Sequence, residues 1–429
     1  MKGKRSTNLF RYVLGIEKKK VRIKIKIQGI IKSVGFEKKG SDCLDQNFLK
    51  NARVAIVHEW WALHGGSENV ASRIASLFPE AKVFCLYIDD EAKESEFKFK
   101  IKESWVRNFP FHRNRSIAAA LSLLAFRSLS LRKFDIVITS SHTFAHTSKF
   151  LNSRKALYLS YVHTPARTLW LPELDSRSKL LKVKAINVGI RKLDTYTNKH
   201  IFAHAANSNE VADRIQRYWK RDSKVIHPPV SLMGRCSDFE FLTKSPYVKS
   251  KKYLISAGRF VEYKRHDFAI QLAGVTNLPI VIMGAGPEEG NLRARAEDLG
   301  VKCEFVISPD TGTWNSFLQN AKCMIFPSFE DFGITPVEAL SLGTPVIALN
   351  SGGSKDYIVD GVNGYLVDGL DVAEFAKAIH SAASLDPEEI ASSSKQFSEE
   401  KFDSNFYDWV ESSAQKFFGQ EKMIEISEL

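Results

Sequence analysis

Short runs of β-branched and aliphatic residues alternate with segments of helical periodicity from residue 53 to residue 349, and this alternation restricts the fold most strongly. Such alternation is typical of parallel sheets with helices on both faces. Paired prolines, Pro228 and Pro229, and a polar stretch to residue 249 indicate a hinge between two α/β domains. The expected strands cover residues 53–57, 82–86, 135–140, 156–162 and 200–205 in the first domain, and residues 252–257, 280–283, 303–306, 323–326 and 346–349 in the second.

The composition predicts a soluble or peripheral globular protein. Its 429 residues suit two or three domains, and its hydrophobic and charged fractions, 44% and 26%, lie near the averages for folded proteins. The longest largely apolar run, residues 117–126, has about half of the ~20 residues that a spanning helix needs. Five cysteines without a C-x-x-C pair predict neither disulfides nor a zinc site, and a reducing cytosol fits best. They are Cys43, Cys85, Cys236, Cys303 and Cys323.

Most of the net charge of +12 lies at the N-terminus. Residues 1–40 contain thirteen Lys or Arg but only two acidic residues, Glu17 and Glu37. Nucleic-acid binders usually carry their positive charge on the folded domain, so we expect no nucleic-acid partner. Residues 1–50 are instead interpreted as a basic arm. Either the arm binds an anionic membrane surface or it is a solvated tail without a partner.

The carboxyl ends of parallel strands are where ligands bind, and three segments there have suitable residues. Gly65 and Gly66 follow the first strand and precede a helical pattern, which indicates either a phosphate-binding loop or an ordinary turn with Ser67 as N-cap. Arg259 and Lys264 follow residues 252–257 and suit the oxygens of a diphosphate.

The segment after residues 323–326 is the most informative of the three. Thr335, Pro336 and Glu338 have the spacing of a capping box, so we expect a helix with Thr335 as N-cap and Pro336 as its first residue. Glu330 then lies in the loop before the helix, where it is either a ligand-binding carboxylate or a solvated loop residue. The backbone amides from Gly333 to Thr335 would face the same cleft and could bind a phosphate or sugar oxygens.

His163 ends residues 156–162 at the same sheet edge, and is either a structural residue or a substrate contact. His58 and His142 end neighbouring strands and are weaker candidates. The absence of a G-x-x-x-x-G-K-[ST] loop disfavours P-loop hydrolysis. Gly284 and Gly286 follow a strand but lack the third glycine of a dinucleotide fingerprint, so we expect no NAD and no other cofactor.

Together these motifs resemble the family-four retaining glycosyltransferases. The resemblance rests on an E-x7-E signature from Glu330 to Glu338, L-G-T-P-V-I-A at 342–348, S-G-G at 351–353 and H-T-P at 163–165, and it covers residues 53 to about 415. Bacterial mannosyltransferases that build O-antigen and exopolysaccharide units from GDP-mannose on a lipid carrier are the most similar members. The family often has an acidic residue soon after the last Gly-Gly, where this chain has Asp356.

The resemblance implies a GT-B fold, with two Rossmann-like domains facing across a cleft and no metal for the donor phosphates. It divides the chain into a basic arm (1–50), an acceptor-side domain (51–235), a nucleotide-sugar domain (236–400) and a C-terminal helix that returns to the first domain (401–429). Arg259 and Lys264 would bind the diphosphate, Glu330 and His163 the sugar, and Glu338 the ribose. The remaining implied contacts are Gly65, Gly66, Gly284, Phe332, Gly333 and Ile334.

The implied partners are a nucleotide-sugar donor, with GDP-mannose first, and a lipid-linked oligosaccharide acceptor. The apolar run 117–126 is bracketed by basic residues, and with the arm it is expected to bring the enzyme to the inner face of the plasma membrane. A core helix with a basic end explains that run equally well. A GT-B epimerase or phosphorylase, and a non-catalytic nucleotide-sugar-binding scaffold, are alternative functions for the whole chain.

Overall fold

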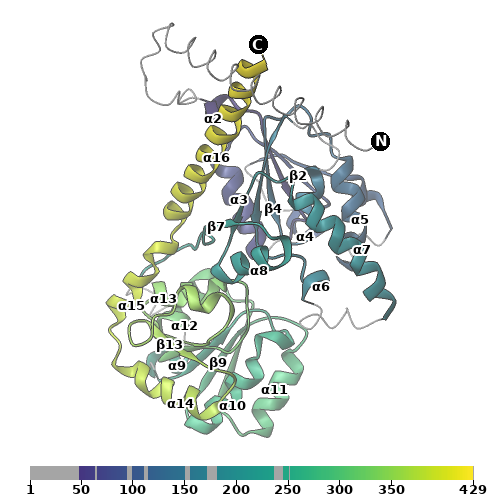
Figure 1. Ribbon diagram of the computed structural model, residues 1–429. Helices are drawn as coiled ribbons and strands as arrows, with labels where there is room; N and C mark the ends of the chain where they lie inside the picture. The colour runs from purple at the N-terminus through teal and green to yellow at the C-terminus, as the bar shows by residue number, and fades with distance from the viewer. Residues whose placement is uncertain are drawn as a thin grey trace, which may run out of the picture. The chain divides into compact units, whose positions relative to one another are not determined.

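The computed structural model describes residues 48–62, 65–93, 99–110, 115–149, 155–171, 181–235, 245–250 and 252–428. Residues 51–417 form one compact unit, and residues 1–50 with 418–429 form another. The expected basic segment 1–40 lies outside the described residues. Within the unit of residues 51–417 we call residues 51–235 the N-terminal half and residues 245–417 the C-terminal half. Each half contains one sheet, so the chain has the expected α/β class with two parallel, Rossmann-like sheets (Figure 1).

The sheet of the N-terminal half has the strand order β3-β2-β1-β4-β5-β6-β7, with every neighbouring pair parallel. Its five predicted strands are confirmed, with ends shifted by up to three residues. Two edge strands were missed, because β3 and β7 have three residues each and are largely polar. The strands are β1 (Val54–His58), β2 (Lys82–Cys85), β3 (Ile101–Glu103), β4 (Ile136–Ser141), β5 (Leu157–Val162), β6 (Ala203–Ala206) and β7 (Ser223–Val225).

Helices connect these strands and cover the sheet. The buried runs of β1, β4 and β5 are apolar over most of their length because both faces of a parallel sheet are covered. The described helices of this half are α2 (Phe48–Asn51), α3 (Gly66–Leu77), α4 (Asp90–Lys93), η1 (Trp105–Asn108), α5 (Arg115–Ser128), η2 (Ala145–Lys149), α6 (Arg167–Trp170), α7 (Leu181–Asn198) and α8 (Asn209–Trp219). No described helix is both long and apolar enough to cross a membrane.

The sheet of the C-terminal half has the order β10-β9-β8-β11-β12-β13, again with parallel neighbours. All five strands predicted for this domain are confirmed. The sixth, β13, was missed because its four residues, G-Y-L-V, begin with a glycine and are too short to show a pattern. The strands are β8 (Leu254–Ala257), β9 (Ile280–Gly284), β10 (Cys303–Ile307), β11 (Cys323–Phe326), β12 (Val346–Leu349) and β13 (Gly364–Val367).

Two apolar cores lie on opposite faces of this second sheet (Figure 1). Phe317 of α12 and Val337 of α13 pack on one face, and Phe268 of α10 and Phe375 of α14 pack on the other. The helices of this half are α9 (Pro246–Ser250), η5 (Glu262–Lys264), α10 (His266–Thr276), α11 (Glu289–Asp298), α12 (Thr311–Asn320), α13 (Ile334–Ser341), η6 (Gly352–Asp356), α14 (Val372–Ser381), η7 (Ala382–Ser384), α15 (Pro387–Ser393) and η8 (Ser394–Phe397).

The last helix, α16 (Glu399–Glu428), begins in the C-terminal half and contacts the N-terminal half. Arg73 of α3 forms ion pairs with Glu399 and Asp403 at 2.6 and 2.5 Å. The ring of Phe402 meets that of Tyr161 of β5 edge-on, with centroids 5.9 Å apart. The predicted helical pattern, residues 402–418, lies inside this longer helix.

His204 of β6 is a buried histidine that no charge partner stabilises. Both ring nitrogens are buried and have no hydrogen-bond partner among the described residues, and the ring of Trp219 packs edge-on against it at 5.5 Å. Burial, and then the positive charge of Arg221, lower the pKa of His204 to about 3. The imidazole is therefore neutral in the folded protein throughout the physiological pH range.

We expect the free energy of unfolding to fall as the pH is lowered from 7.5 to 5.5, with His204 responsible for part of the loss. The unfolded histidine has a pKa near 6.5, so below that pH only the unfolded state takes up the proton, down to the folded pKa of about 3. Between pH 7.5 and pH 5.5, protonation of His204 in the unfolded state lowers the free energy of unfolding by about 1.4 kcal/mol. Urea titrations of the wild type and of His204→Phe measure it. An unchanged pH dependence in the variant would contradict the prediction.

Candidate functional site

The loops after β8 and β11 bring together the two predicted residues of opposite charge. Lys264 ends the short helix η5, and its Nζ forms an ion pair with Oε1 of Glu330. Ser328 Oγ lies 3.3 Å from the same oxygen, and the Lys264 ammonium lies 5.7 Å from the ring centre of Phe326. The side chains of Lys264 and Glu330 are only 11% and 17% exposed. A charge pair this far out of water interacts strongly, and its two members could hold a phosphate and a hydroxyl group respectively.

Arg259 lies on the same loop as Lys264 and is exposed. Its Nη2 lies 3.2 Å from the hydroxyl of Tyr263. The His266 ring holds the backbone of this loop. Its Nε2 donates to the Arg259 carbonyl at 3.2 Å, and its Nδ1 accepts from Ser256 Oγ at 2.8 Å. Burial lowers the pKa of His266 to about 4, so the ring stays neutral and keeps this arrangement. The arginine therefore projects from a fixed backbone.

The backbone of Gly284 packs against the loop after β8, which carries Arg259 and Lys264. It has φ of 141°, and a Cβ there would lie 1.9 Å from the carbonyl oxygen of Gly258. Gly286 makes a similar approach, with a Cβ position 2.5 Å from the carbonyl oxygen of Phe260. The loops after β8 and β9 therefore touch through their backbones, which only glycine permits. This contact sets the position of Arg259 and Lys264.

The loop that carries Glu330 is held by the Ser-Gly-Gly segment after β12. The backbone N–H of Gly353 donates to the Glu330 carbonyl at 2.9 Å. A Cβ on Gly352 would lie 2.2 Å from that carbonyl oxygen, and one on Gly353 would lie 2.3 Å from Cα of Phe332. These two glycines allow the two loops to pack backbone on backbone, so the S-G-G motif positions the Glu330 loop.

The predicted capping box at Thr335 is wrong. Helix α13 begins at Ile334 with Gly333 as N-cap, and no side chain caps it. The N-cap is therefore two residues earlier than predicted. Gly333 has φ of 90°, and a Cβ there would lie 2.9 Å from the Tyr357 hydroxyl and 3.0 Å from Cζ of Phe326. The Glu338 carboxylate instead accepts a hydrogen bond from Trp314 Nε1 at 3.2 Å. Burial raises the pKa of Glu338.

The predicted N-cap at Ser67 is also wrong. Helix α3 begins at Gly66 with Gly65 as N-cap, and the Ser67 hydroxyl donates to Glu68 at 2.6 Å. The glycine at 66 faces the C-terminal half, since a Cβ there would lie 3.4 Å from Cδ1 of Ile334. The first turns of α3 and α13 therefore meet. Phe332, by contrast, has its side chain buried in the core, where its ring packs on those of His227, Tyr357 and Phe397.

Three histidines at the ends of β1, β4 and β5 form a cluster. The rings of His58, His142 and His163 have centroids between 5.8 and 6.4 Å apart. Ser140 Oγ lies 3.1 Å from His58 Nδ1 and 2.8 Å from His163 Nε2. Burial lowers the pKa of His163 well below its usual value, and that of His58 less strongly. His163 is therefore a neutral hydrogen-bonding group, held by Ser140.

Sequence reasoning assigned no role to the residue next to Glu330. Asp331 forms ion pairs with two arginines of the N-terminal half, Arg167 and Arg214, each at 2.5 Å. Arg167 and Asp331 belong to segments with a signal, since Arg167 follows the H-T-P motif and Asp331 lies within E-x7-E. Arg214 lies in α8, outside the motifs named above. The sequence alone does not show that these segments meet.

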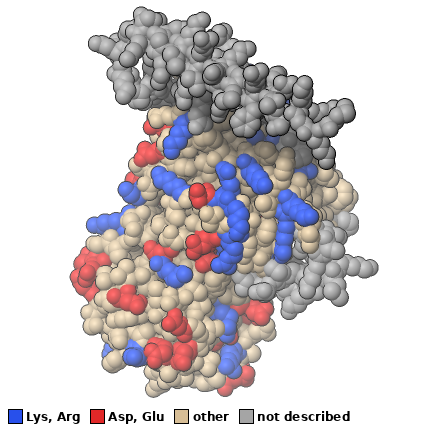
Figure 2. All heavy atoms as spheres, in the orientation of Figure 1, with Lys and Arg blue, Asp and Glu red and all other residues tan. Residues whose placement is uncertain are grey.

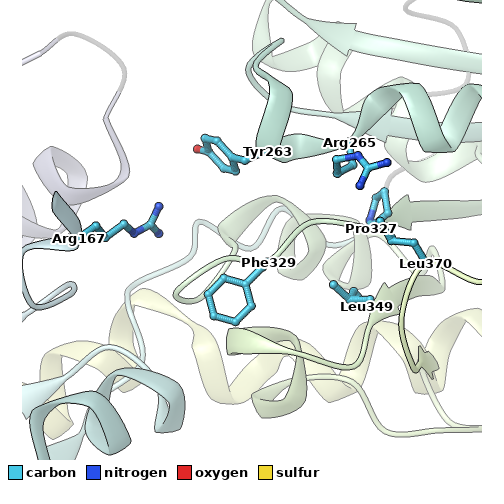
Figure 3. Close-up of a pocket in the computed structure, with 7 residues that line it drawn as sticks. All are labelled: Arg167, Tyr263, Arg265, Pro327, Phe329, Leu349 and Leu370. Atoms are coloured by element: carbon cyan, nitrogen blue, oxygen red, sulfur yellow. The ribbon is translucent and has the colours of Figure 1, made fainter. Parts of the chain in front are cut away.

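A pocket of about 220 Å³ is lined by sequence neighbours of Lys264 and Glu330 (Figure 3). Arg167 is its one lining residue from the N-terminal half, and Tyr263 and Arg265 flank Lys264 in sequence. The close-up places Phe329 between Arg167 and the apolar wall. That wall consists of Pro327, Leu349 and Leu370. Within the described ranges no group of three or more His, Cys, Asp or Glu has the arrangement of a metal site.

A family model matches part of the C-terminal half. Residues 238–401 match the family described as Glycosyl transferases group 1. The matched segment contains Lys264, Glu330 and Glu338, so the ion pair of this site lies inside the segment that is similar to group 1 glycosyl transferases.

Curated relatives and solved structures extend the similarity. The chain is 25% identical to alpha-1,3/1,6-mannosyltransferase ALG2 of Dictyostelium discoideum, over 62% of this chain and 70% of the relative. It is 32% identical to the lipopolysaccharide core biosynthesis glycosyltransferase LpsE of Rhizobium meliloti, over 40% of this chain and about half (51%) of the relative. Anabaena HepE, solved with UDP and glucose, has a TM-score of 0.64 at 15% identity and covers 84% of this chain and 100% of its own. The last likeness confirms the expected GT-B fold.

We expect Gly284→Ala to destabilise the protein by more than about 2 kcal/mol, because the new Cβ would overlap the Gly258 carbonyl and the backbone is in a region costly for other residues. Gly290→Ala is the matched control. Gly290 lies in α11, and nothing stands within 4 Å of its Cβ position, so alanine there should be neutral or stabilising. Urea unfolding measures both variants, and equal stabilities would contradict the prediction.

Proposed function

We propose that this chain is a metal-independent, retaining glycosyltransferase that transfers a hexose from a nucleotide-sugar to a lipid-linked or glycan acceptor in bacterial surface polysaccharide synthesis. The ion pair of Lys264 and Glu330, within the segment that matches group 1 glycosyl transferases, carries this proposal. It places an ammonium group and a carboxylate in contact where three strand ends and the N-terminus of α13 converge.

In this proposal the donor replaces the direct contact between Lys264 and Glu330. Lys264 and Arg259 bind the diphosphate, and Glu330 accepts hydrogen bonds from hydroxyls of the donor sugar. Glu338 binds the ribose of the nucleotide. The residues Gly65, Gly66, Gly284, Phe332, Gly333 and Ile334 provide close backbone contacts to the donor.

The chemical step depends mainly on electrostatic stabilisation. The departing nucleoside diphosphate gains negative charge as the bond to the sugar breaks, and Lys264 and Arg259 stabilise that charge. Their positions are set before the donor arrives, because Gly284 and His266 hold the backbone of their loop. His163, whose pKa is lowered by burial, contacts the sugar as a neutral group.

The donor proposed first is GDP-mannose. The name of ALG2 describes a mannosyltransferase, whereas HepE was solved with UDP and glucose, so UDP-sugars are the main competitors. A ligand that binds the native state raises its melting temperature, so a thermal-shift comparison of GDP-mannose, GDP-glucose, UDP-glucose and ADP-glucose identifies the donor. Analysis of the products then separates transfer from epimerisation and phosphorolysis.

We expect Glu330→Gln and Lys264→Met each to lower the rate of nucleoside diphosphate release from the donor by at least about 100-fold, with the fold retained. Lys377→Met is the matched control, because Lys377 forms a surface ion pair with Glu374 on α14 and is 77% exposed. A coupled assay for the released diphosphate measures the rates, and circular dichroism checks the fold. Turnover at the wild-type rate in both site variants would contradict the roles proposed for Glu330 and Lys264.

We also propose that the protein binds the inner face of the plasma membrane through the N-terminal half. Trp105 of η1 and Leu124 of α5 are 43% and 61% exposed, and Trp105 Nε1 donates to Ser128 at the end of α5. Figure 2 shows Lys and Arg gathered on the visible face of the N-terminal half. Exposed basic residues in α7, α8 and β7, or directly after these two helices, are Lys192, Lys199, Arg217, Lys220 and Lys224. Apolar and basic side chains together suit an anionic lipid surface.

We expect the full chain to float with vesicles that contain phosphatidylglycerol but not with pure phosphatidylcholine vesicles. Deleting residues 1–40, or changing Trp105 and Leu124 to serine, should each lower recovery because they remove basic charge or apolar contact. Val275→Ser is the control, since Val275 of α10 is also 61% exposed but belongs to the C-terminal half. Equal recovery of all variants would count against membrane binding.

A further inference from the structure

Asp331 ties the loop of Glu330 to the N-terminal half. Its Oδ2 accepts from Arg167 Nη2 and its Oδ1 from Arg214 Nη1, each at 2.5 Å. The Asp331 side chain is 13% exposed, so both contacts are largely shielded from water. Charge-assisted hydrogen bonds of this kind are short and strong.

Arg214 is a buried anchor for this contact. Its side chain is 3% exposed, and its Nε pairs with Glu210 one turn earlier on α8. The same Nη1 that binds Asp331 lies 3.1 Å from Thr164 Oγ1, immediately after His163. The guanidinium also lies 5.2 Å from the ring of Phe329. Asp331 is therefore connected to the end of β5 and to α8 through one fixed side chain.

A second acidic residue of the C-terminal half, Asp356 in the segment after β12, also binds residues of the N-terminal half. Asp356 accepts from the backbone N–H and the side chain of Asn209 at 2.8 and 3.1 Å, and His227 Nε2 lies 3.0 Å from it. This loop includes Gly353, whose N–H holds the Glu330 carbonyl. Both sides of the Glu330 loop are thus attached to the N-terminal half.

The side chain of Glu330 is held differently from the backbone around it. Lys264, from the same half, pairs with the Glu330 carboxylate, whereas two arginines from the opposite half hold the neighbouring residue, Asp331. Adjacent Cα atoms are only 3.8 Å apart, so a shift of Asp331 moves the base of the Glu330 side chain. Displacement of a reacting group by about 1 Å can lower a rate by about 100-fold.

We propose that Asp331 is a positioning residue, whose ion pairs with Arg167 and Arg214 hold the Glu330 carboxylate in place for glycosyl transfer. This inference rests on the proposed function. It adds that the N-terminal half holds the sugar-binding carboxylate of the C-terminal half in position. Arg214 contacts the Glu330 loop through Asp331 and through the ring of Phe329, whereas Arg167 also lines the pocket.

The experiment measures release of nucleoside diphosphate from GDP-mannose, or from UDP-glucose if that gives the larger thermal shift, by the full-length protein. Asp331→Asn and Arg214→Met are compared with Arg73→Gln, which breaks an ion pair of similar length between α3 and α16, away from the Glu330 loop. We expect kcat to fall at least about 10-fold in the first two variants while KM for the donor stays within about 3-fold. Arg73→Gln should keep the wild-type kcat.

The double variant Asp331→Asn/Arg214→Met distinguishes positioning from two separate effects. It should be no slower than the slower single variant, because each substitution breaks the same contact. If the two losses multiply, if kcat stays within 2-fold of the wild type, or if only KM rises, Asp331 does not position Glu330. Should Asp331→Asn fail to fold, Arg214→Met alone gives the same test. A wild type that neither binds nor cleaves any nucleotide-sugar would instead contradict the proposed function.

Discussion

The site depends first on the parallel pairing of the strands in both sheets. Parallel strands place their carboxyl ends at one edge, so the loops after β8, β9 and β11 must lie side by side. Lys264 and Glu330 are 66 residues apart in sequence and meet only because of this arrangement. The glycines after β9 and β12 then let the loops touch backbone to backbone, which fixes the charged side chains more closely than side-chain packing would.

Charge and burial divide the ionisable groups of the molecule into two classes. The histidines at the strand ends and beneath the cation loop, among them His163 and His266, are buried and neutral, because desolvation lowers the pKa of each. The buried charged groups at the site, by contrast, are paired across loops or across the two halves. Buried charge is retained where a partner is in contact, as Arg214 and Asp331 show.

The contacts between the two halves also relate the family signature to the rest of the chain. The E-x7-E segment lies in the part that matches group 1 glycosyl transferases, yet the two arginines that hold Asp331 lie outside residues 238–401. The contacts that hold the Glu330 loop to the N-terminal half therefore involve residues outside the matched segment. In the proposed reaction both halves contact the donor, and the N-terminal half also holds the loop that carries Glu330.

The sequence by itself determined the fold class and ten of the strands, because hydrophobic periodicity is a local feature. Strand-end motifs also singled out Lys264 and Glu330, but they did not predict that the two side chains form an ion pair. It did not predict the short edge strands, which bury too little to leave a pattern. Both predicted helix caps, at Ser67 and Thr335, were wrong, because each helix has a glycine as N-cap two residues earlier, Gly65 and Gly333. Only the tertiary structure decided that Asp331 pairs with Arg167 and Arg214, since contacts across 117 or more residues depend on how the halves meet.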